Sequence, residues 1–368
     1  MSVIKIEFDN LIRPKVIIAQ VISLAFIGIL VLFLLLQFNP VKADTIGVGL
    51  VTDTGGLYDM SFNWLSYQGL LRAESELGVV GTVYTSTTSA DYETNLTQCV
   101  MDGNDLCISV GFLTSSAILD AAQTYSNTKF ALVDGSFENY PSNLRGIIFA
   151  SNEAGYLAGT LAGLMTQSDV IGDIGGLEIP PVTDFTESYQ RAAECINPQV
   201  TTIITYTNDF GNPELGAITA QGMISQGADV IFAAAGPTGA GAIITATQSN
   251  VWAIGVDSDN YVTVFNNGLV DGAEYLLSSA MKRPDNAVFL TISDIVNATF
   301  TSGTKLYDLA VDGVGLAPFH EADPFVPQSV RNTLDRVKQD IVNGRIDVNG
   351  PCPEYPVYLP IILNNANE

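Results

Sequence analysis

The sequence predicts an α/β protein that consists of two doubly wound lobes of mostly parallel sheet. Short apolar runs of strand length alternate with longer segments of helical pattern, and this alternation predicts βαβ units. The series restarts after residue 150, which predicts a second lobe of the same kind. The length of 368 residues is sufficient for two domains, each with its own core.

The first series of elements begins after residue 43. Its strands are predicted from apolar runs at 46–51, 79–84, 105–110, 129–133 and 144–149. Helical patterns lie between the first four runs, at 61–77, 89–101 and 113–125. This order is typical of a parallel sheet whose crossovers are helices.

The second series begins with a helix of small residues at 152–167. Strands are predicted at 169–174, 200–206, 229–234 and 251–256, with helices near 185–195, 213–226 and 238–248. The tail adds a strand at 274–282, a helix at 285–301, a strand at 305–312 and an amphipathic helix at 327–343. We expect the tail to return elements to both lobes.

The expected domain division follows from this order. It comprises an N-terminal segment, two discontinuous lobes and a tail: 1–43; 44–150 plus 260–288; 151–259 plus 289–345; and 346–368. A ligand cleft between the lobes is the expected site. Closure is expected as a hinge motion at crossings near 149–151 and 256–262.

Residues 16–38 carry no charge and are numerous enough to cross a bilayer as a helix. Lys5, Arg13 and Lys15 precede them, so we expect the N-terminus in the cytoplasm and the rest exported. The segment is either an uncleaved membrane anchor or a long signal peptide cut after Ala43. Both alternatives predict an extracytoplasmic protein, secreted or anchored to the cell membrane.

The net charge is −24 at pH 7, and the chain beyond residue 43 carries nearly all of the acidic side chains. Such a surface repels phosphate backbones, which argues against nucleic acid as a partner. The charge does not disfavour a small neutral ligand.

Four cysteines fit an oxidising compartment. Three pairings are possible, and we expect the local one, Cys99 with Cys107 and Cys195 with Cys352. No Cys-x-x-Cys occurs and His320 is the only histidine, so we expect neither a zinc site nor another cofactor.

Acidic and aromatic residues recur at the predicted strand ends, where open parallel sheets bind ligands. The candidates are Asp53, Phe62, Asn63, Asp134, Phe210, Gly236, Asp257, Asp259 and Lys282. Two phenylalanines on opposite lobes can clamp a flat ring, and carboxylates suit the donors of a base or a sugar. Helix capping is the alternative for each acid, with Ser61 as the expected cap of the first helix, and core packing is the alternative for each phenylalanine.

Catalysis has little support in the sequence. Neither a G-x-S-x-G nucleophile elbow nor a metal-binding constellation occurs. The glycine-rich stretch 236–241 lacks the lysine and the spacing of a phosphate loop.

Several stretches resemble the basic membrane protein family of ABC-transporter substrate-binding proteins, which includes purine-nucleoside receptors. They are VTDTGGLYDMSFN at 51–63, NEAGYLAGTLAG at 152–163, AAAGPTGAG at 233–241, IGVDSDN at 254–260, MKRPDNAV at 281–288 and VGLAPFHEADPFVPQSV at 314–330. The resemblance covers about residues 45–348. It implies the type I periplasmic-binding-protein fold, with two lobes joined by a hinge of several crossings. It also implies a non-enzymatic role as the binding component of an ABC importer, with permease subunits and the membrane as partners.

The resemblance further implies a purine nucleoside (adenosine, guanosine or inosine) as ligand. Asp53 and Asp134 would meet the base, with Asn63 nearby, while Phe62 and Phe210 would stack on it. Gly236 would offer backbone contacts. Asp257 or Asp259, with a preference for Asp259, would hold the ribose hydroxyls together with Lys282.

This chain departs from the family pattern in three ways. No cysteine lies between residues 1 and 98 to carry a lipid, Pro237 replaces a common glycine, and residues 351–368 extend the chain with an apolar tail. The alternative functions are a sensor ectodomain, a binding protein for a sugar or another small ligand, and a nucleoside hydrolase. The last would need a calcium-type aspartate cluster that the sequence does not offer.

Overall fold

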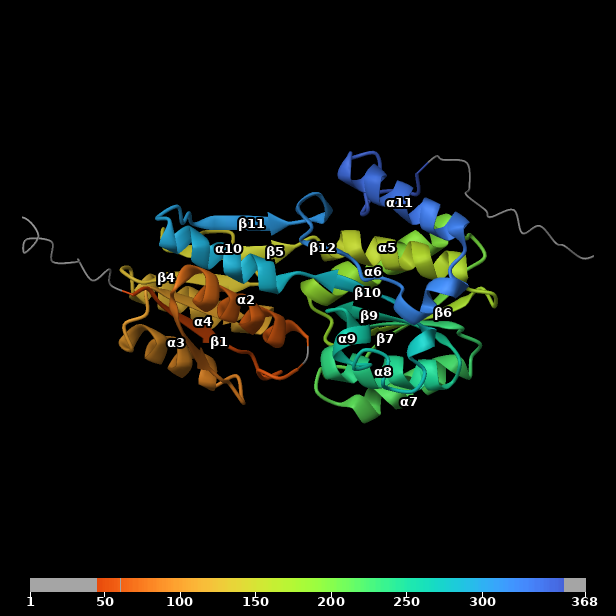
Figure 1. Ribbon diagram of the computed structural model, residues 1–368, viewed down its shortest axis with the longest axis horizontal. Helices are drawn as coiled ribbons and strands as arrows, with labels where there is room; N and C mark the ends of the chain where they lie inside the picture. Colours follow the sequence, from red (N-terminus) through yellow and green to blue (C-terminus); the bar gives the residue numbers. More distant parts are fainter. Residues whose placement is uncertain (1–44, 60, 354–368) are drawn as a thin grey trace, which may run out of the picture. The chain divides into compact units, whose positions relative to one another are not determined.

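The computed structural model describes residues 45–59 and 61–353 (Figure 1). Within these residues the strands form two six-stranded sheets, in the orders β11-β5-β4-β3-β1-β2 and β12-β10-β9-β8-β6-β7. We call the first sheet and the helices that pack on it the first lobe, and the second sheet with its helices the second lobe. The predicted α/β class with two doubly wound sheets is confirmed.

The first sheet is parallel throughout. Its strands are β1 (Gly47–Val51), β2 (Val80–Tyr84), β3 (Leu106–Val110), β4 (Lys129–Val133), β5 (Leu144–Phe149) and β11 (Gly303–Tyr307). Helix α2 (Phe62–Leu77) packs with α10 (Pro284–Val296), and α3 (Asp91–Met101) packs with α4 (Ser115–Thr124), which follows the short helix η1 (Phe112–Thr114). These pairs cover opposite faces of the sheet (Figure 1).

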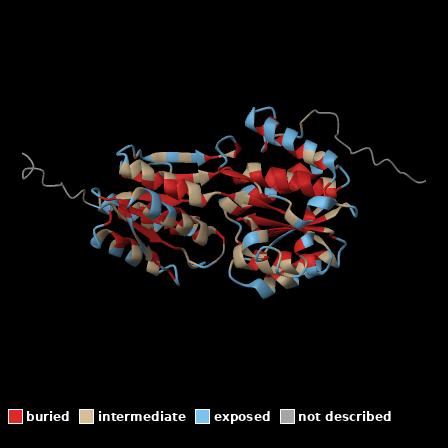
Figure 2. Cartoon of the chain, in the orientation of Figure 1, coloured by how far each residue is buried: buried red, intermediate tan, exposed pale blue. Residues whose placement is uncertain are grey.

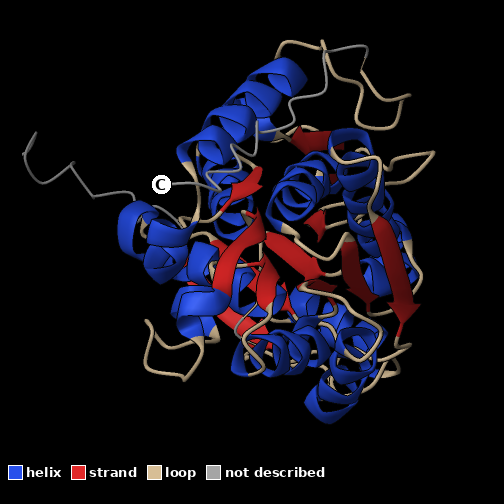
Figure 3. Cartoon of the chain, turned by 90° about the vertical axis from the view of Figure 1, so that its right-hand side faces the viewer, coloured by secondary structure: helices blue, strands red, loops and turns tan. Residues whose placement is uncertain are grey.

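The second sheet is parallel except for its edge strand β12 (Val314–Leu316), which runs antiparallel to β10. Its parallel strands are β6 (Val170–Gly175), β7 (Thr201–Tyr206), β8 (Val230–Ala234), β9 (Trp252–Asp257) and β10 (Leu276–Lys282). Helices α5 (Ser151–Met165), α6 (Pro180–Ile196) and α11 (Gln328–Val342) pack together, and α7 (Pro213–Ile224) packs with α8 (Gly236–Gln248). Helices therefore flank the strands on two sides (Figure 3).

The chain passes between the two sheets three times within the described residues. It crosses from β5 to α5 near 149–151, from β10 to α10 near 282–284, and from β11 to β12 near 307–314. The expected crossing near 149–151 is confirmed. The one expected near 256–262 is wrong, because β9 and β10 are neighbours in the second sheet.

The two tail strands lie on the opposite side of the expected division. β10 falls in the range expected for the first lobe but pairs with β9 of the second. β11 falls in the range expected for the second lobe but pairs with β5 of the first. The predicted strand 305–312 also ends early, because the Asp308 carboxylate accepts from the backbone N–H groups of Ala310 and Val311 and begins the short helix η3 (Leu309–Val311).

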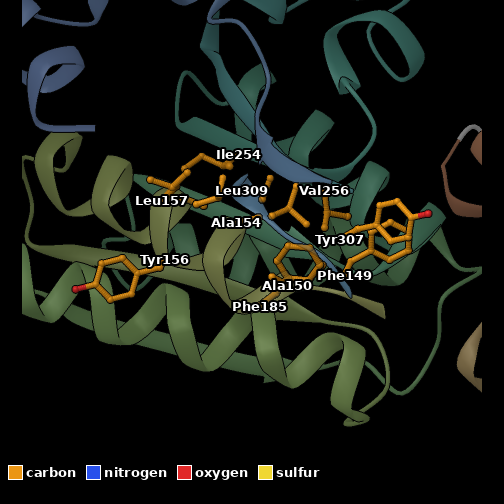
Figure 4. Close-up of a cluster of buried hydrophobic side chains, with 14 of the residues drawn as sticks. Phe149, Ala150, Ala154, Tyr156, Leu157, Phe185, Ile254, Val256, Tyr307 and Leu309 are labelled. Atoms are coloured by element: carbon orange, nitrogen blue, oxygen red, sulfur yellow. The ribbon is translucent and has the colours of Figure 1, made fainter. Parts of the chain in front are cut away.

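Buried residues concentrate in the strands and on the inner faces of the helices (Figure 2). A hydrophobic cluster continues through the region where the chain crosses between the sheets (Figure 4). Phe149 of β5 and Tyr307 of β11 lie there with ring centroids 5.8 Å apart, and Ala154 of α5 and Val256 of β9 belong to the same cluster. The lobes are therefore joined by packed side chains as well as by the crossings.

Glycines on α5 explain why α5 and α6 pack closely. A Cβ atom added to Gly159 would lie 2.0 Å from the carbonyl oxygen of Tyr189 on α6, and Gly155 and Gly163 meet α6 in the same way. The small-residue pattern predicted for this helix therefore serves a backbone-to-backbone contact.

Both predicted disulfides are confirmed, Cys99–Cys107 and Cys195–Cys352. In residues 45–59 and 61–353, no helix is both long and apolar enough to cross a bilayer. The predicted membrane or signal segment at 16–38 lies outside the described residues, as does most of the tail 346–368.

Candidate functional site

A cavity of about 560 Å³ lies at the carboxyl ends of the strands of both sheets. The first lobe contributes to its walls through the loops that follow β1, β3 and β4, and the second lobe through those that follow β6, β7, β8 and β9. Loops at this edge of an open parallel sheet are the usual place for ligands. A volume of this size falls in the range of small-molecule sites.

Eight of the nine predicted site residues line this cavity: Asp53, Phe62, Asn63, Asp134, Phe210, Gly236, Asp257 and Lys282. Asp259 does not. Its carboxylate accepts from the backbone N–H of Tyr261, which begins the short helix α9 (Asn260–Thr263), and its Oδ2 lies 2.8 Å from Nε2 of His320. Of the two candidate acids, the structure therefore brings Asp257 to the cavity and gives Asp259 a capping role.

Asp53 lies in the loop after β1, and Asn63 of α2 holds its side chain in place. The side-chain amide of Asn63 donates to Asp53 Oδ1 at 2.7 Å, and the Asn63 amide oxygen accepts from the backbone N–H of Asp53 at 3.2 Å. Gly55 N–H donates to the same carboxylate. Burial raises the pKa of Asp53, and the bonds from Asn63 and Gly55 oppose that rise. The side chain is thus a fixed acceptor at the cavity wall.

Asp59, not the expected Ser61, caps helix α2. Its carboxylate accepts from the backbone N–H groups of Ser61, Asn63 and Trp64, and also from the side-chain amide of Asn63. Carboxylates are favoured at helix N-termini because they satisfy the unpaired N–H groups there. The hydroxyl of Ser61 makes no capping bond.

Three charged side chains from both lobes meet in the cavity. Nζ of Lys282, at the end of β10, donates to Oδ2 of Asp134 at 2.7 Å, and both side chains are largely buried. Asp257 lies in the electrostatic field of the same lysine and of Asp134. Among the cavity-lining residues of the described chain, Lys282 is the single cation, whereas the carboxylates are Asp53, Asp59, Asp134, Asp209 and Asp257.

Burial raises the pKa of Asp257 to about 6. Lys282 opposes this rise and Asp134 adds to it, while the hydrogen bond from Ser61 lowers the pKa. Asp134 and Asp257 both have left-handed backbone conformations, with φ of 69° and 62°. Backbone strain of this kind tends to gather at functional sites, where the surrounding structure enforces it.

Aromatic side chains from both lobes line the cavity. Phe62 of α2 lies in the first lobe, with Nζ of Lys282 5.6 Å from its ring centroid. Phe210 follows β7 in the second lobe and lies against Gly176, where an added Cβ would fall 2.1 Å from the ring. The glycine therefore makes room for the ring, and Gly236 lies beside the Phe210 backbone.

A largely apolar part of the cavity wall was not predicted from the sequence. It includes Phe112 and Leu113 after β3, and Leu177, Ile179, Pro181, Val182 and Phe185 around the start of α6. The Pro180–Pro181 pair is the sequence feature that could have indicated this part of the wall, because prolines favour the first turn of a helix, and a helix that starts here follows the end of a strand. Phe185 is 2% exposed, and in the sequence it resembles a core residue.

Comparisons with known proteins agree with this architecture. A sequence model of the family described as ABC transporter substrate-binding protein PnrA-like matches residues 46–351. The CD4+ T-cell-stimulating antigen of Listeria monocytogenes is 34% identical over 327 residues, which cover 84% of this chain and 88% of that protein. The ABC transporter nucleoside-binding protein BmpA of Lactococcus lactis is 30% identical, over 84% of this chain and 90% of its own. Among solved structures, an ABC transporter solute-binding protein from Aeropyrum pernix K1 superposes with a TM-score of 0.75 at 25% identity, over 84% of this chain and 94% of that one.

Proposed function

This chain belongs to the PnrA-like family of ABC transporter substrate-binding proteins, and we propose that its cavity binds a purine nucleoside. Membership of this family makes the chain a binding protein and not an enzyme. The observation that carries the nucleoside proposal is the joint presence of Phe62 and Phe210, from opposite lobes, with carboxylates at one cavity.

The charges in the cavity support a neutral ligand that donates hydrogen bonds. Carboxylates accept but do not donate when ionised, and the cationic Lys282 is already bonded to Asp134. A phosphate group would face five aspartates and would be repelled. The exocyclic amine or ring N–H of a base and the hydroxyls of ribose are donors of the required kind.

We assign two parts of the cavity to two parts of the ligand. Phe62 and Phe210 stack on the base, which Asp53 and Asp134 recognise by its donors, with backbone contacts at Gly236. Asp257 and Lys282 hold the ribose hydroxyls. A sugar alone is the second candidate, because these same two polar side chains suit any vicinal hydroxyls, whereas phenylalanines from both lobes favour a flat ring.

In this proposal the protein works outside the cytoplasm and delivers the nucleoside to the permease subunits of an ABC importer. The family assignment supports this role. Tethering is assigned to the apolar segment at 16–38, because it carries no charge and is long enough to cross a bilayer as a helix.

The test of ligand class begins with the full-length chain purified in mild detergent. Mass spectrometry identifies small molecules released on denaturation, and calorimetry then measures binding of adenosine, guanosine, inosine and ribose. A nucleoside that binds while ribose does not supports the proposal. Heat from ribose or another sugar, with none from any nucleoside, overturns it.

The aromatic clamp is tested by Phe62→Ala and Phe210→Ala. We expect each to weaken nucleoside binding by about 2 kcal/mol, or ~30-fold, because each removes stacking and apolar contact. Phe325→Ala is the matched control, since Phe325 is 56% exposed and does not line the cavity. Wild-type affinity in both cavity variants would contradict the clamp.

A further inference from the structure

Besides the bond between Lys282 and Asp134, a second hydrogen bond of the described residues joins the two lobes at the cavity. The hydroxyl of Ser61, at the start of α2 in the first lobe, donates to Oδ2 of Asp257, at the end of β9 in the second, at 3.0 Å. The two residues are 196 positions apart in the sequence. A motion that opens the lobes separates them, so the bond exists only while the lobes are together.

The Ser61 hydroxyl is available for this bond because Asp59 does the capping. Asp59 Oδ1 accepts from the backbone N–H of Ser61 at 2.9 Å, which fixes the position of the serine. Ser61 is 7% exposed, so its hydroxyl has little access to solvent. The hydroxyl therefore faces Asp257 from a fixed backbone position and with little exposure to solvent.

The bond also acts on the charge of Asp257. The charged groups that face this carboxylate are Lys282 at the end of β10, Asp134 after β4 and Asp59 in the loop before α2. Lysine favours the ionised form and the two aspartates disfavour it. A hydroxyl that donates to the carboxylate favours the ionised form as well, so Ser61 and Lys282 act in the same direction.

We propose that Ser61 is a positioning residue that stabilises the closed lobes and keeps Asp257 ionised and oriented toward the ligand. The proposal rests on the proposed function, in which Asp257 binds the ligand's hydroxyls. Closure slows ligand release, because the ligand leaves only when the lobes part. Loss of the Ser61 hydroxyl thus speeds dissociation and leaves the encounter with the open form unchanged.

The experiment compares Ser61→Ala with Ser61→Thr, which restores a hydroxyl, and Ser61→Cys, which keeps the shape but donates weakly. Ser225→Ala is the matched control, since the Ser225 hydroxyl donates to the carbonyl of Gly222 at the C-terminal end of α7, and Ser225 does not line the cavity. The first readout is the titration of the Asp257 carboxyl carbon by NMR in the protein saturated with nucleoside, with Asp257→Asn to assign the signal. The second is stopped-flow association and dissociation of the nucleoside.

We expect Ser61→Ala to raise the titration midpoint of Asp257 and to increase the dissociation rate about tenfold, with the association rate constant changed less than twofold. Ser61→Thr restores both values, and Ser225→Ala changes neither. An unchanged Asp257 midpoint, or an unchanged dissociation rate, in Ser61→Ala overturns the proposal. If no nucleoside binds the wild type, the proposed function itself fails, whereas nucleoside binding that does not respond to Ser61→Ala overturns only the inference about Ser61.

Discussion

Asp173 gives the sharpest test of the energetics of this fold. It lies in the middle of β6, between β7 and β8, with no exposed surface. In the described part of the chain neither of its carboxylate oxygens has a hydrogen-bond partner. Desolvation therefore raises the pKa of Asp173 well above its ordinary value, because burial without a hydrogen-bond partner favours the neutral acid.

The size of the effect follows from proton linkage. The unfolded chain releases the Asp173 proton near pH 3.9, while the folded protein keeps it to higher pH. The folded state then binds more protons than the unfolded state, so the free energy of unfolding falls as the pH rises. The loss is about 1.4 kcal/mol for each pH unit between the unfolded and the folded pKa.

The assay is urea unfolding of wild type and Asp173→Asn at pH 5 and pH 6. The variant keeps the side-chain shape but has no proton to lose, so its stability relative to wild type should increase between the two pH values, by at most about 1.4 kcal/mol. The difference between the proteins isolates Asp173 from the other carboxylates. A stability difference that stays constant across this pH range would refute a buried, neutral Asp173.

Two further predictions concern the packing and the cross-links of the fold. Gly159→Ala should destabilise the protein by about 2–3 kcal/mol in urea unfolding, because the added Cβ would collide with the Tyr189 carbonyl. In the control Gly222→Ala the added Cβ meets nothing within 4 Å, so this variant should stabilise the protein by about 0.5–1 kcal/mol. Equal effects of the two substitutions would contradict the close packing of α5 against α6. Replacing Cys195 and Cys352 together by serine should cost about 2–4 kcal/mol by the same measurement, since their disulfide spans 157 residues, and an unchanged stability would show that the cross-link constrains nothing.

The order of strands and helices was predictable because buried parallel strands are continuous apolar runs. Most strand ends agree to within one residue, as for the run at 129–133, which is β4. The partners of the tail strands were not predictable. The apolar runs of β10 and β11 do not say which sheet each strand joins, and part of the reason lies in helix packing: Gly69 on α2 meets the backbone of Asp285, so that α10 packs against the first lobe.

The candidate site was predictable where it depends on strand ends, because parallel strands bring those ends to one edge. Asp53, Asp134 and Asp257 follow from this rule and line the cavity. Asp259 does not, although it is only two residues beyond Asp257. Its hydrogen bond to the backbone of Tyr261 is a local signal that the sequence offered, since an aspartate before a short helical stretch is a common cap.

The arrangement around Asp257 favours a ligand that donates hydrogen bonds. A pKa of about 6 in place of 3.8 means that the ionised form is disfavoured by about 3 kcal/mol relative to water. Lys282 and Ser61 already act against burial in this value, so the energy of about 3 kcal/mol is the part of the penalty that they leave uncompensated. A sugar that places two hydroxyls on the carboxylate removes more of it, whereas an apolar ligand or an anion removes none. Ligand class, lobe closure and the charge of Asp257 are therefore coupled through the same few atoms.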